Sequence, residues 1–351
     1  MTATTRTDMR APASPLVWRI SAIVISILLL GLIILVSGES PLAVIDAMIG
    51  GAFGTPDKIG RVVNTLTVLL LCSAGLVFTF NAGLYNLGIE GQITFGAIAA
   101  TLALRLFGAV LPGPIAIALC IIFGAIGGML WGLLAGVLKV HGRISEIFAG
   151  LGLNFVAQAL AIYLIFGPWK RAGVASTSGT EPFNDTLWLG AFGTTEATPV
   201  GVALALIATI ATIVIVRRTH YGLRLRAVGR NPRASFVLGI PASRQMLSAF
   251  ALCGILAGVG GALQVSGNFH RLIPTISGSL GYLGLLVVML VNFDPLWVLP
   301  VAFFFSALNV GSLQLPLVLE KVDSSLSGVI QGMLVLAALI GRGFAEINVK
   351  Q

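Results

Sequence analysis

The chain has 351 residues, of which 57% are hydrophobic and 10% carry a charged side chain, and its mean hydropathy is +1.00. Soluble domains carry about 25% charged residues, so this composition excludes a soluble globular protein and indicates a membrane protein of many helices. The net charge of +8 does not point to nucleic acid as a partner, because the basic residues lie at the ends of apolar segments, where membrane topology requires them.

Ten apolar segments divide the chain, and we predict an all-α polytopic membrane protein with one membrane domain over residues 16–341. Residues 1–15 form a disordered N-terminus, residues 39–60 an external segment, and residues 342–351 a short tail. The predicted spans are 16–37, 61–80, 93–107, 115–138, 144–166, 200–216, 246–265, 278–292, 296–313 and 326–340.

A basic loop at 217–245 orients these spans. It holds seven of the chain's 21 Lys and Arg residues and no acidic residue, so it stays on the cytoplasmic side. Counting from this loop puts 14 of the 21 basic residues inside, both termini in the cytoplasm and the polar loop 167–199 outside. On composition alone the loop is equally well a simple topology anchor or a docking element.

Glycine recurs along one face of two predicted spans. Residues Gly124, Gly128, Gly132 and Gly136 lie four apart in the fourth span, and Gly254, Gly258 and Ala262 do so in the seventh. Such faces let neighbouring helices approach backbone to backbone. The pattern therefore predicts a tightly packed bundle, whatever it transports.

Residues 81–92, NAGLYNLGIEGQ, interrupt two apolar segments with three glycines and several polar side chains. A broken helix leaves backbone groups unpaired, which a membrane tolerates only inside protein or beside a watery cavity. A glutamate at this depth, Glu90, is costly and usually faces a pathway or a partner. An ordinary turn between spans remains an alternative, and the two interpretations can coexist.

Three polar residues occupy the fifth span. Asn154 and Gln158 are four residues apart, and Glu146 lies two turns before Asn154. Hydrogen bonding between helices and contact with a ligand explain this stripe equally well. Uncharged amide and hydroxyl groups suit a neutral, hydroxyl-rich ligand. The candidate pathway residues are Asn81, Tyr85, Asn86, Glu90, Gln92, Glu146, Asn154 and Gln158.

Signals for enzymatic chemistry are missing from the sequence. Cys72, Cys120 and Cys253 lie in apolar runs without disulfide or metal spacing, and there is no H-E-x-x-H motif. The chain contains no Gly-Lys dipeptide, so it has no phosphate-binding loop. We expect no metal, no cofactor and no enzymatic activity, and any ATP hydrolysis must come from a separate subunit.

Four segments resemble the permease subunits of bacterial ABC importers for simple sugars and nucleosides, which are related to branched-chain amino acid permeases. They are NAGLYNLGIEGQ at 81–92, GRISEIFAGLGLNFVA at 142–157, THYGLRLRAVGRNPRASFVLGI at 219–240 and the glycine-containing segment 281–311. The resemblance covers about residues 60–340, and its length and long external loop are most similar to the nucleoside branch. One departure is Arg233-Ala234-Ser235, where ABC import permeases more broadly carry Glu-Ala-Ala.

The resemblance implies a multi-pass protein of the bacterial plasma (inner) membrane that works with an ABC ATPase, a second and different permease, and an external binding protein. It makes 217–245 the loop that couples to the ATPase. Asn231 and Pro232 are suited to start a short helix there, Phe236 to make an apolar contact, and Gly239 to end it in a left-handed conformation. The coupling candidates are Gly222, Arg224, Arg226, Gly229, Arg230, Asn231, Ala234, Phe236 and Gly239.

The favoured function is therefore the permease of an ATP-driven importer. The alternative is an ion-coupled secondary transporter of a small neutral solute, working without an ATPase. That class would need a proton or sodium site, for which Glu90 together with Glu146 is the candidate. An intramembrane enzyme has no supporting constellation of residues.

Overall fold

A computed structural model describes residues 31–32, 34–35, 38–171, 173, 178–193 and 195–318, with the isolated positions 328–329, 332–333 and 336. Every regular element within these residues is a helix. The chain forms two compact units, Met1–Gly51 with Gly311–Gln351, and Ala52–Val310. All the candidate residues lie in the second unit.

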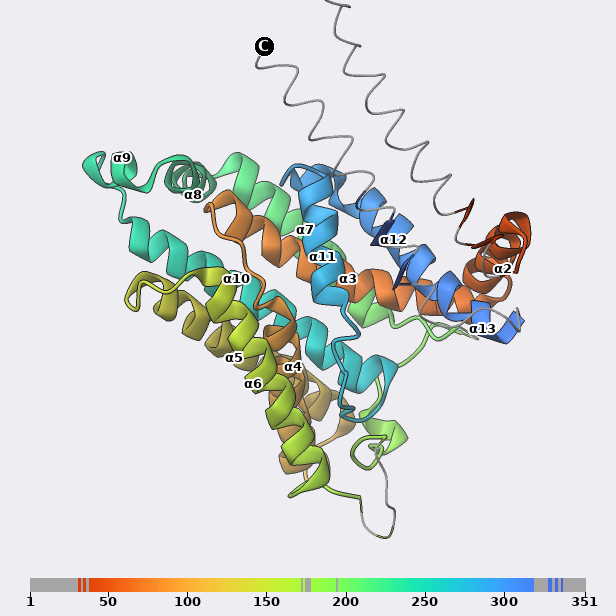
Figure 1. The fold of residues 1–351 in the computed structure, drawn as a ribbon. Helices are drawn as coiled ribbons and strands as arrows, with labels where there is room; N and C mark the ends of the chain where they lie inside the picture. Colours follow the sequence, from red (N-terminus) through yellow and green to blue (C-terminus); the bar gives the residue numbers. More distant parts are fainter. Residues whose placement is uncertain are drawn as a thin grey trace, which may run out of the picture. The chain divides into compact units, whose positions relative to one another are not determined.

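Figure 1 shows the helices in chain order. Short helical turns also occur at Asp185–Leu187, Gln264–Asn268 and Pro295–Trp297, the middle one a π-helix. The α-helices are α2 (Pro41–Phe53), α3 (Pro56–Asn81), α4 (Ile89–Phe107), α5 (Gly113–Val140), α6 (Glu146–Phe166), α7 (Pro199–Arg218), α8 (His220–Arg230), α9 (Pro232–Val237), α10 (Ala242–Leu263), α11 (Leu280–Leu290), α12 (Val298–Leu313) and α13 (Leu315–Val318).

Six of the ten predicted spans appear as helical segments long and apolar enough to cross a membrane. They are Pro56–Asn81, Gly113–Val140, Glu146–Phe166, Pro199–Arg218, Ala242–Asn268 and Pro295–Leu313. The third and eighth predicted spans are the helices α4 and α11, of which α11 has only 11 residues. The predicted spans 16–37 and 326–340 lie largely outside the described residues.

The segment 39–60, which the sequence predicts to be external, is helical over most of its length. Helix α2 occupies Pro41–Phe53, and α3 already begins at Pro56. The two prolines stand at helix starts, where the missing N–H has no intrahelical partner to lose. Thr55 caps α3 by accepting a hydrogen bond from the Lys58 amide. Proline here marks the beginning of helices rather than a loop.

The predicted glycine interface joins α4, α5 and α10. A Cβ atom on Gly128 of α5 would lie 2.6 Å from the Gly258 Cα atom, and one on Gly124 would lie 2.8 Å from the Gly258 carbonyl oxygen. A Cβ atom on Gly96 of α4 would lie 2.9 Å from the same oxygen. Gly258 of α10 therefore stands where three helix backbones meet, and the close packing expected from the sequence is confirmed.

The turns of the second unit gather at two ends. At one end the α3–α4 turn contacts α8 through Gly83 and Gly229, and α6 through Gly88 and Gly150. The α11–α12 turn joins them there, because Asp294 forms an ion pair with the Arg217 side chain. Counting spans from the basic loop 217–245 predicts that these turns lie on the cytoplasmic side.

The other end collects the segments expected outside. The amide of Thr180 donates to the Leu272 carbonyl, and the Trp188 ring stacks on His270 with centroids 3.9 Å apart. Asn64 near the start of α3 accepts a hydrogen bond from the Thr198 amide at 3.0 Å. The sorting of turns agrees with the expected sidedness, and the assignment of one end to the cytoplasm stays a prediction.

We expect Gly258→Val to prevent normal folding. Its side chain would meet backbone atoms of α5, which cannot move aside as a side chain could, so the cost exceeds the about 1–3 kcal/mol typical of overpacking. The matched control is Gly50→Val in α2, because a Cβ atom there has nothing within 4 Å. Size-exclusion profiles and thermal unfolding of the purified variants should separate the two. Equal behaviour would show that the α4–α5–α10 contact is not tight.

Candidate translocation and coupling sites

The break predicted at 81–92 is present. Helix α3 ends at Asn81, α4 begins at Ile89, and the residues between them are not helical. Gly83 has a φ of +74°, and the amide of Leu84 donates back to the Thr79 carbonyl oxygen. A left-handed glycine with such a backward hydrogen bond is a common helix ending, so the local sequence explains where α3 stops.

Asn154 of α6 pairs the backbone that the break leaves open. Its side-chain oxygen accepts from the Gly91 amide at 2.8 Å, and its side-chain nitrogen donates to the Leu87 carbonyl oxygen at 2.8 Å. The same nitrogen lies 3.0 Å from the Tyr282 hydroxyl of α11. One carboxamide thus binds both the end of the break and the first turn of α4.

Asn86 and Gln92 pair with each other. Both side chains are fully buried, and their carboxamides exchange hydrogen bonds of 3.3 and 3.2 Å. The Asn86 nitrogen also lies 3.1 Å from the Cys253 sulfur atom of α10. The pair satisfies its own polar groups within the bundle.

Glu90 and Asn81 bind the break to α11 and to the turn that follows it. The buried Glu90 carboxylate accepts from the Tyr282 amide at 2.9 Å, in the first turn of α11. Asn81 donates to the Val77 and Phe293 carbonyl oxygens. The break is therefore held from α6, α10 and α11 together.

The remaining pathway candidates are more accessible. Tyr85 is 44% exposed and packs edge-on against Phe80. Glu146 forms an ion pair of 2.6 Å with Lys139 across the α5–α6 turn. Gln158 is exposed although Asn154 is buried, so the two do not share one environment.

Sequence reasoning missed two partners of the break. Tyr282 supplies both its amide and its hydroxyl group, and Gly150 lets α6 touch the backbone at Gly88. The signal for Tyr282 is its place as the one polar aromatic residue in α11. Gly150 could be suspected only because it shares a helix face with Asn154.

The basic loop contains two helices. Thr219 caps α8 by accepting from the Gly222 amide, and α8 buries Leu225 and Val228 while Arg224, Arg226 and Arg230 are exposed. Gly222 and Gly229 face inward, where Cβ atoms would collide with the carbonyl oxygens of Val216 and Asn81 respectively. Tyr221 shares a hydrogen bond with Ser248 of α10, and burial raises the pKa of its phenol.

The short helix predicted after Asn231 is confirmed as α9. The Asn231 side chain accepts from the Arg233 and Ala234 amides at 3.1 and 3.0 Å, and Pro232 occupies the first helical position. Gly239 ends the turn with a φ of +77°. Phe236, Val237 and Leu238 are 75%, 85% and 76% exposed and form what we call the α9 apolar patch.

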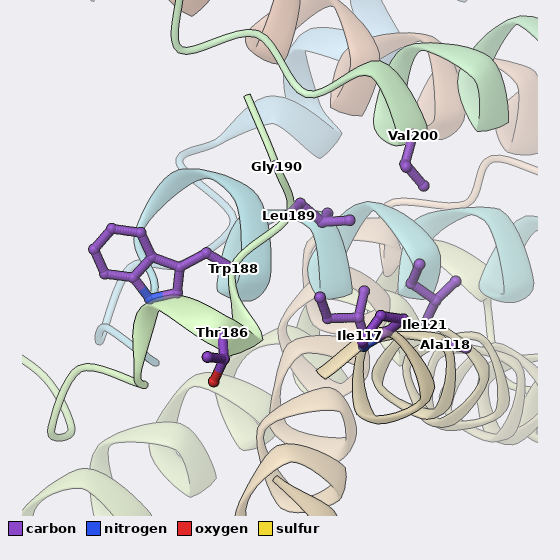
Figure 2. Close-up of a pocket in the computed structure, with 9 residues that line it drawn as sticks. Ile117, Ala118, Ile121, Thr186, Trp188, Leu189, Gly190 and Val200 are labelled. Atoms are coloured by element: carbon purple, nitrogen blue, oxygen red, sulfur yellow. The ribbon is translucent and has the colours of Figure 1, made fainter. Parts of the chain in front are cut away.

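A cavity of about 410 Å³ lies at the opposite end, between α5, the start of α7 and the segment 186–190. Figure 2 shows the labelled side chains around it, which are mostly apolar, with Thr186 as a polar member. None of the sequence-predicted site residues lines this cavity. Within the described residues no three His, Cys, Asp or Glu side chains are grouped as metal ligands would be.

We expect Asn154→Ala to lower the thermal stability of the purified chain, because Leu87 and Gly91 then lose a buried partner. Leaving such groups unsatisfied costs about 1–3 kcal/mol. Gln158→Ala, one turn further along the same helix, should leave stability unchanged, since its side chain is exposed. The unfolding temperatures of both variants test this expectation. Equal unfolding temperatures would contradict the structural role of Asn154.

The chain is similar to a family of known membrane transport proteins. Residues 58–339 match the family described as branched-chain amino acid transport system / permease component. The nucleoside ABC transporter permease proteins NupB and NupC of Lactococcus lactis are 27% and 30% identical, over 83% and 81% of this chain and 82% and 96% of theirs. The glucose ABC transporter permease protein TsgB13 of Haloferax volcanii is 27% identical over 85% of this chain and 79% of its own. With its helical bundle, its break at 82–88 and its basic helices α8 and α9, the chain belongs to this permease family and is the membrane-spanning subunit of an ABC importer.

Proposed function

We propose that this chain forms half of the translocation pathway of an ATP-driven importer for nucleosides or a simple sugar, in the plasma (inner) membrane of a bacterium. The names of NupB, NupC and TsgB13 support these two substrate classes. The neutral amide and hydroxyl groups of the candidate pathway suit such ligands. A nucleoside is the first candidate, because of the long external loop 167–199.

The observation that carries the proposal is the α9 apolar patch. Phe236 and Val237 end a capped helix of six residues, too short to cross a membrane, and Leu238 follows it directly, among the exposed arginines of a basic segment. Apolar side chains presented together on a polar surface mark a protein contact. The partner we propose is the ATPase subunit, with acidic side chains facing Arg224, Arg226 and Arg230 and a groove for Phe236.

A second permease completes the pathway in this proposal. Helix α6 exposes Phe155, Tyr163 and the amide of Gln158 along its length. An exposed carboxamide on a spanning helix is unfavourable against lipid and favourable against protein or water. We therefore propose that α6 faces the second permease, a different chain as NupB differs from NupC, and that Tyr85, Glu146 and Gln158 border the pathway.

The other candidates do not border the pathway in this proposal but hold the backbone that does. Asn81, Asn86, Glu90, Gln92 and Asn154 fix the backbone of the break, and Tyr85 is presented by that backbone. At the opposite end, loop 167–199 is the surface we propose for the external binding protein. The membrane domain thereby joins three protein partners and lipid.

Ion coupling without an ATPase has less support. A shared proton or sodium site would bring Glu90 and Glu146 together. Glu90 instead accepts from the start of α11, and Glu146 pairs with Lys139. Each carboxylate has its own partner, so neither is poised to bind an ion with the other.

Uptake by the reconstituted complex tests the substrate class. We expect a nucleoside to be taken up and a nucleoside monophosphate to be excluded, because no basic residue of the described spans lies away from a span end to balance phosphate. Radiolabelled uptake into proteoliposomes with the ATPase, both permeases and the binding protein measures this, with the binding protein omitted as control. Uptake of a simple sugar alone would move the proposal to the sugar branch, and ATP-independent uptake would overturn it.

We expect Phe236→Ala and Gly239→Val to abolish coupling. Truncating a buried aromatic anchor commonly costs about 2 kcal/mol or more at an interface. Valine at position 239 disfavours the left-handed turn that ends α9. Binding-protein-stimulated ATP hydrolysis and uptake should fall together while the chain still inserts.

The matched control for the patch is Arg224→Ala, because an exposed charge is largely screened and should matter less. Co-purification of the ATPase with each variant measures docking directly. Normal uptake in both Phe236→Ala and Gly239→Val would mean that 217–245 only anchors the topology.

A further inference from the structure

The break between α3 and α4 is pressed at both ends against a glycine of another helix. A Cβ atom on Gly229 of α8 would lie 2.9 Å from the Gly83 amide nitrogen, and one on Gly150 of α6 would lie 2.5 Å from the Gly88 amide nitrogen. No side chain fits between these backbones. Because packed interiors deform little, a shift of either helix must move the break.

Bonds reinforce the contact at the α6 end. Asn154 holds Leu87 and Gly91, one on each side of Gly88. The Glu146 carboxylate at the start of α6 also interacts with the backbone of Tyr85. The first three turns of α6 therefore hold residues 85–91 by polar contacts as well as by packing.

The α8 end is also held from two sides. Gly229 touches the backbone at Gly83, while Asn81 donates to the Phe293 carbonyl oxygen. Phe293 stacks on Phe80 with ring centroids 4.8 Å apart, and its neighbour Asp294 is bound by Arg217 at 2.7 Å. Arg217 lies in the last turn of α7, which leads into α8, so the end of α3 is tied to α8 directly and to α7 through Phe293 and Asp294.

These contacts matter because α8 and α6 have different principal neighbours. Helix α8 packs mainly on α7, α9, α3 and α10, whereas α6 packs mainly on α4 and α5. Residues 82–88 are the segment that joins the α3 side to the α4 side along the chain, and they touch both α8 and α6. A displacement of α8 thus reaches α6 through them.

We propose that residues 82–88 are a mechanical link that carries movement of α8 to α6 through the contacts Gly229–Gly83 and Gly150–Gly88. The proposal rests on the proposed function, in which the ATPase moves α8 and α9 and in which α6 borders the pathway. The link delivers that movement to α6 near Tyr85. Gly83, Gly88, Gly150 and Gly229 are positioning residues, since none of them needs to touch the substrate.

The first test compares Gly229→Ala and Gly150→Ala with Gly152→Ala in the complete complex of both permeases, ATPase and binding protein. Gly152 lies on α6 one half-turn from Gly150, and a Cβ atom there has nothing within 4 Å. We expect Gly150→Ala to bind the ATPase and to keep basal ATP hydrolysis, because Gly150 lies on α6, outside the basic loop. In both Gly150→Ala and Gly229→Ala, uptake and stimulation by loaded binding protein should fall about tenfold, within the range of coupling between sites. Gly152→Ala should behave as the wild type, and normal uptake in both contact variants would overturn the link.

Hydrogen exchange of the same complex distinguishes a broken link from general damage. In the wild type, a non-hydrolysable ATP analogue should change amide exchange in α8 and α9, in 82–88 and in the first turns of α6. In Gly229→Ala the change should stay within α8 and α9. If the analogue changes amide exchange in α6 of Gly229→Ala as much as it does in the wild type, the proposal is overturned.

The wild-type complex separates failure of the link from failure of the proposed function. If the ATPase does not bind the wild-type chain, the proposed function fails. If it binds and the analogue changes exchange in α8 and α9 but not in 82–88 and α6, the link alone is refuted. This comparison holds even where a glycine variant does not assemble.

Discussion

The backbone groups freed between α3 and α4 must find partners inside the bundle, and much of the second unit is arranged around that need. An unpaired N–H or C=O group in hydrocarbon costs several kcal/mol, so a break survives only where protein replaces the lost helical bonds. Asn154 replaces two of them, and Glu90 turns the same segment toward the start of α11. Because these bonds are short and directional, α6 and α11 cannot drift from the break without exposing it.

The glycine interface gives this arrangement a firm base. Helices α4, α5 and α10 meet at Gly258 with backbones in contact, which favours a body that moves as one piece. The break joins this group of helices at Ile89, where α4 begins. Earlier in the break, Gly83 contacts Gly229 of α8. A stiff core beside a non-helical connection is the usual arrangement for rigid-body alternating access, in which helix groups rock around a fixed site. Glycine thus makes the close backbone contacts both in the core, at Gly258, and at the break, at Gly83 and Gly88.

Local chemistry was predictable from the sequence, and tertiary placement was not. The capped start and left-handed end of α9, the glycine faces and the break all follow from residues within a few positions of one another. Gln158 shows the limit: it lies four residues after Asn154, but the buried stripe of α6 runs through Asn154, Ala157 and Ala161 and leaves position 158 at its edge. Tyr282 could not be found as the partner of Glu90, since 192 positions separate the two. Helix α2 was missed because proline and glycine suit helix starts as well as loops.

Exposed apolar side chains have two meanings in this chain. On α5, α6 and α7 they cover helices long enough and apolar enough to span a membrane, where apolar surroundings suit them. At α9 and Leu238 they stand beside arginines on a segment too short to span a membrane, where such a group of apolar side chains marks a contact surface. The exposed apolar side chains of α9 beside arginines are the observation on which we base its proposed contact with the ATPase. Helix α8, which precedes α9, touches the break through the backbone contact of Gly229 with Gly83, and a side chain at position 229 would collide with the Asn81 carbonyl oxygen.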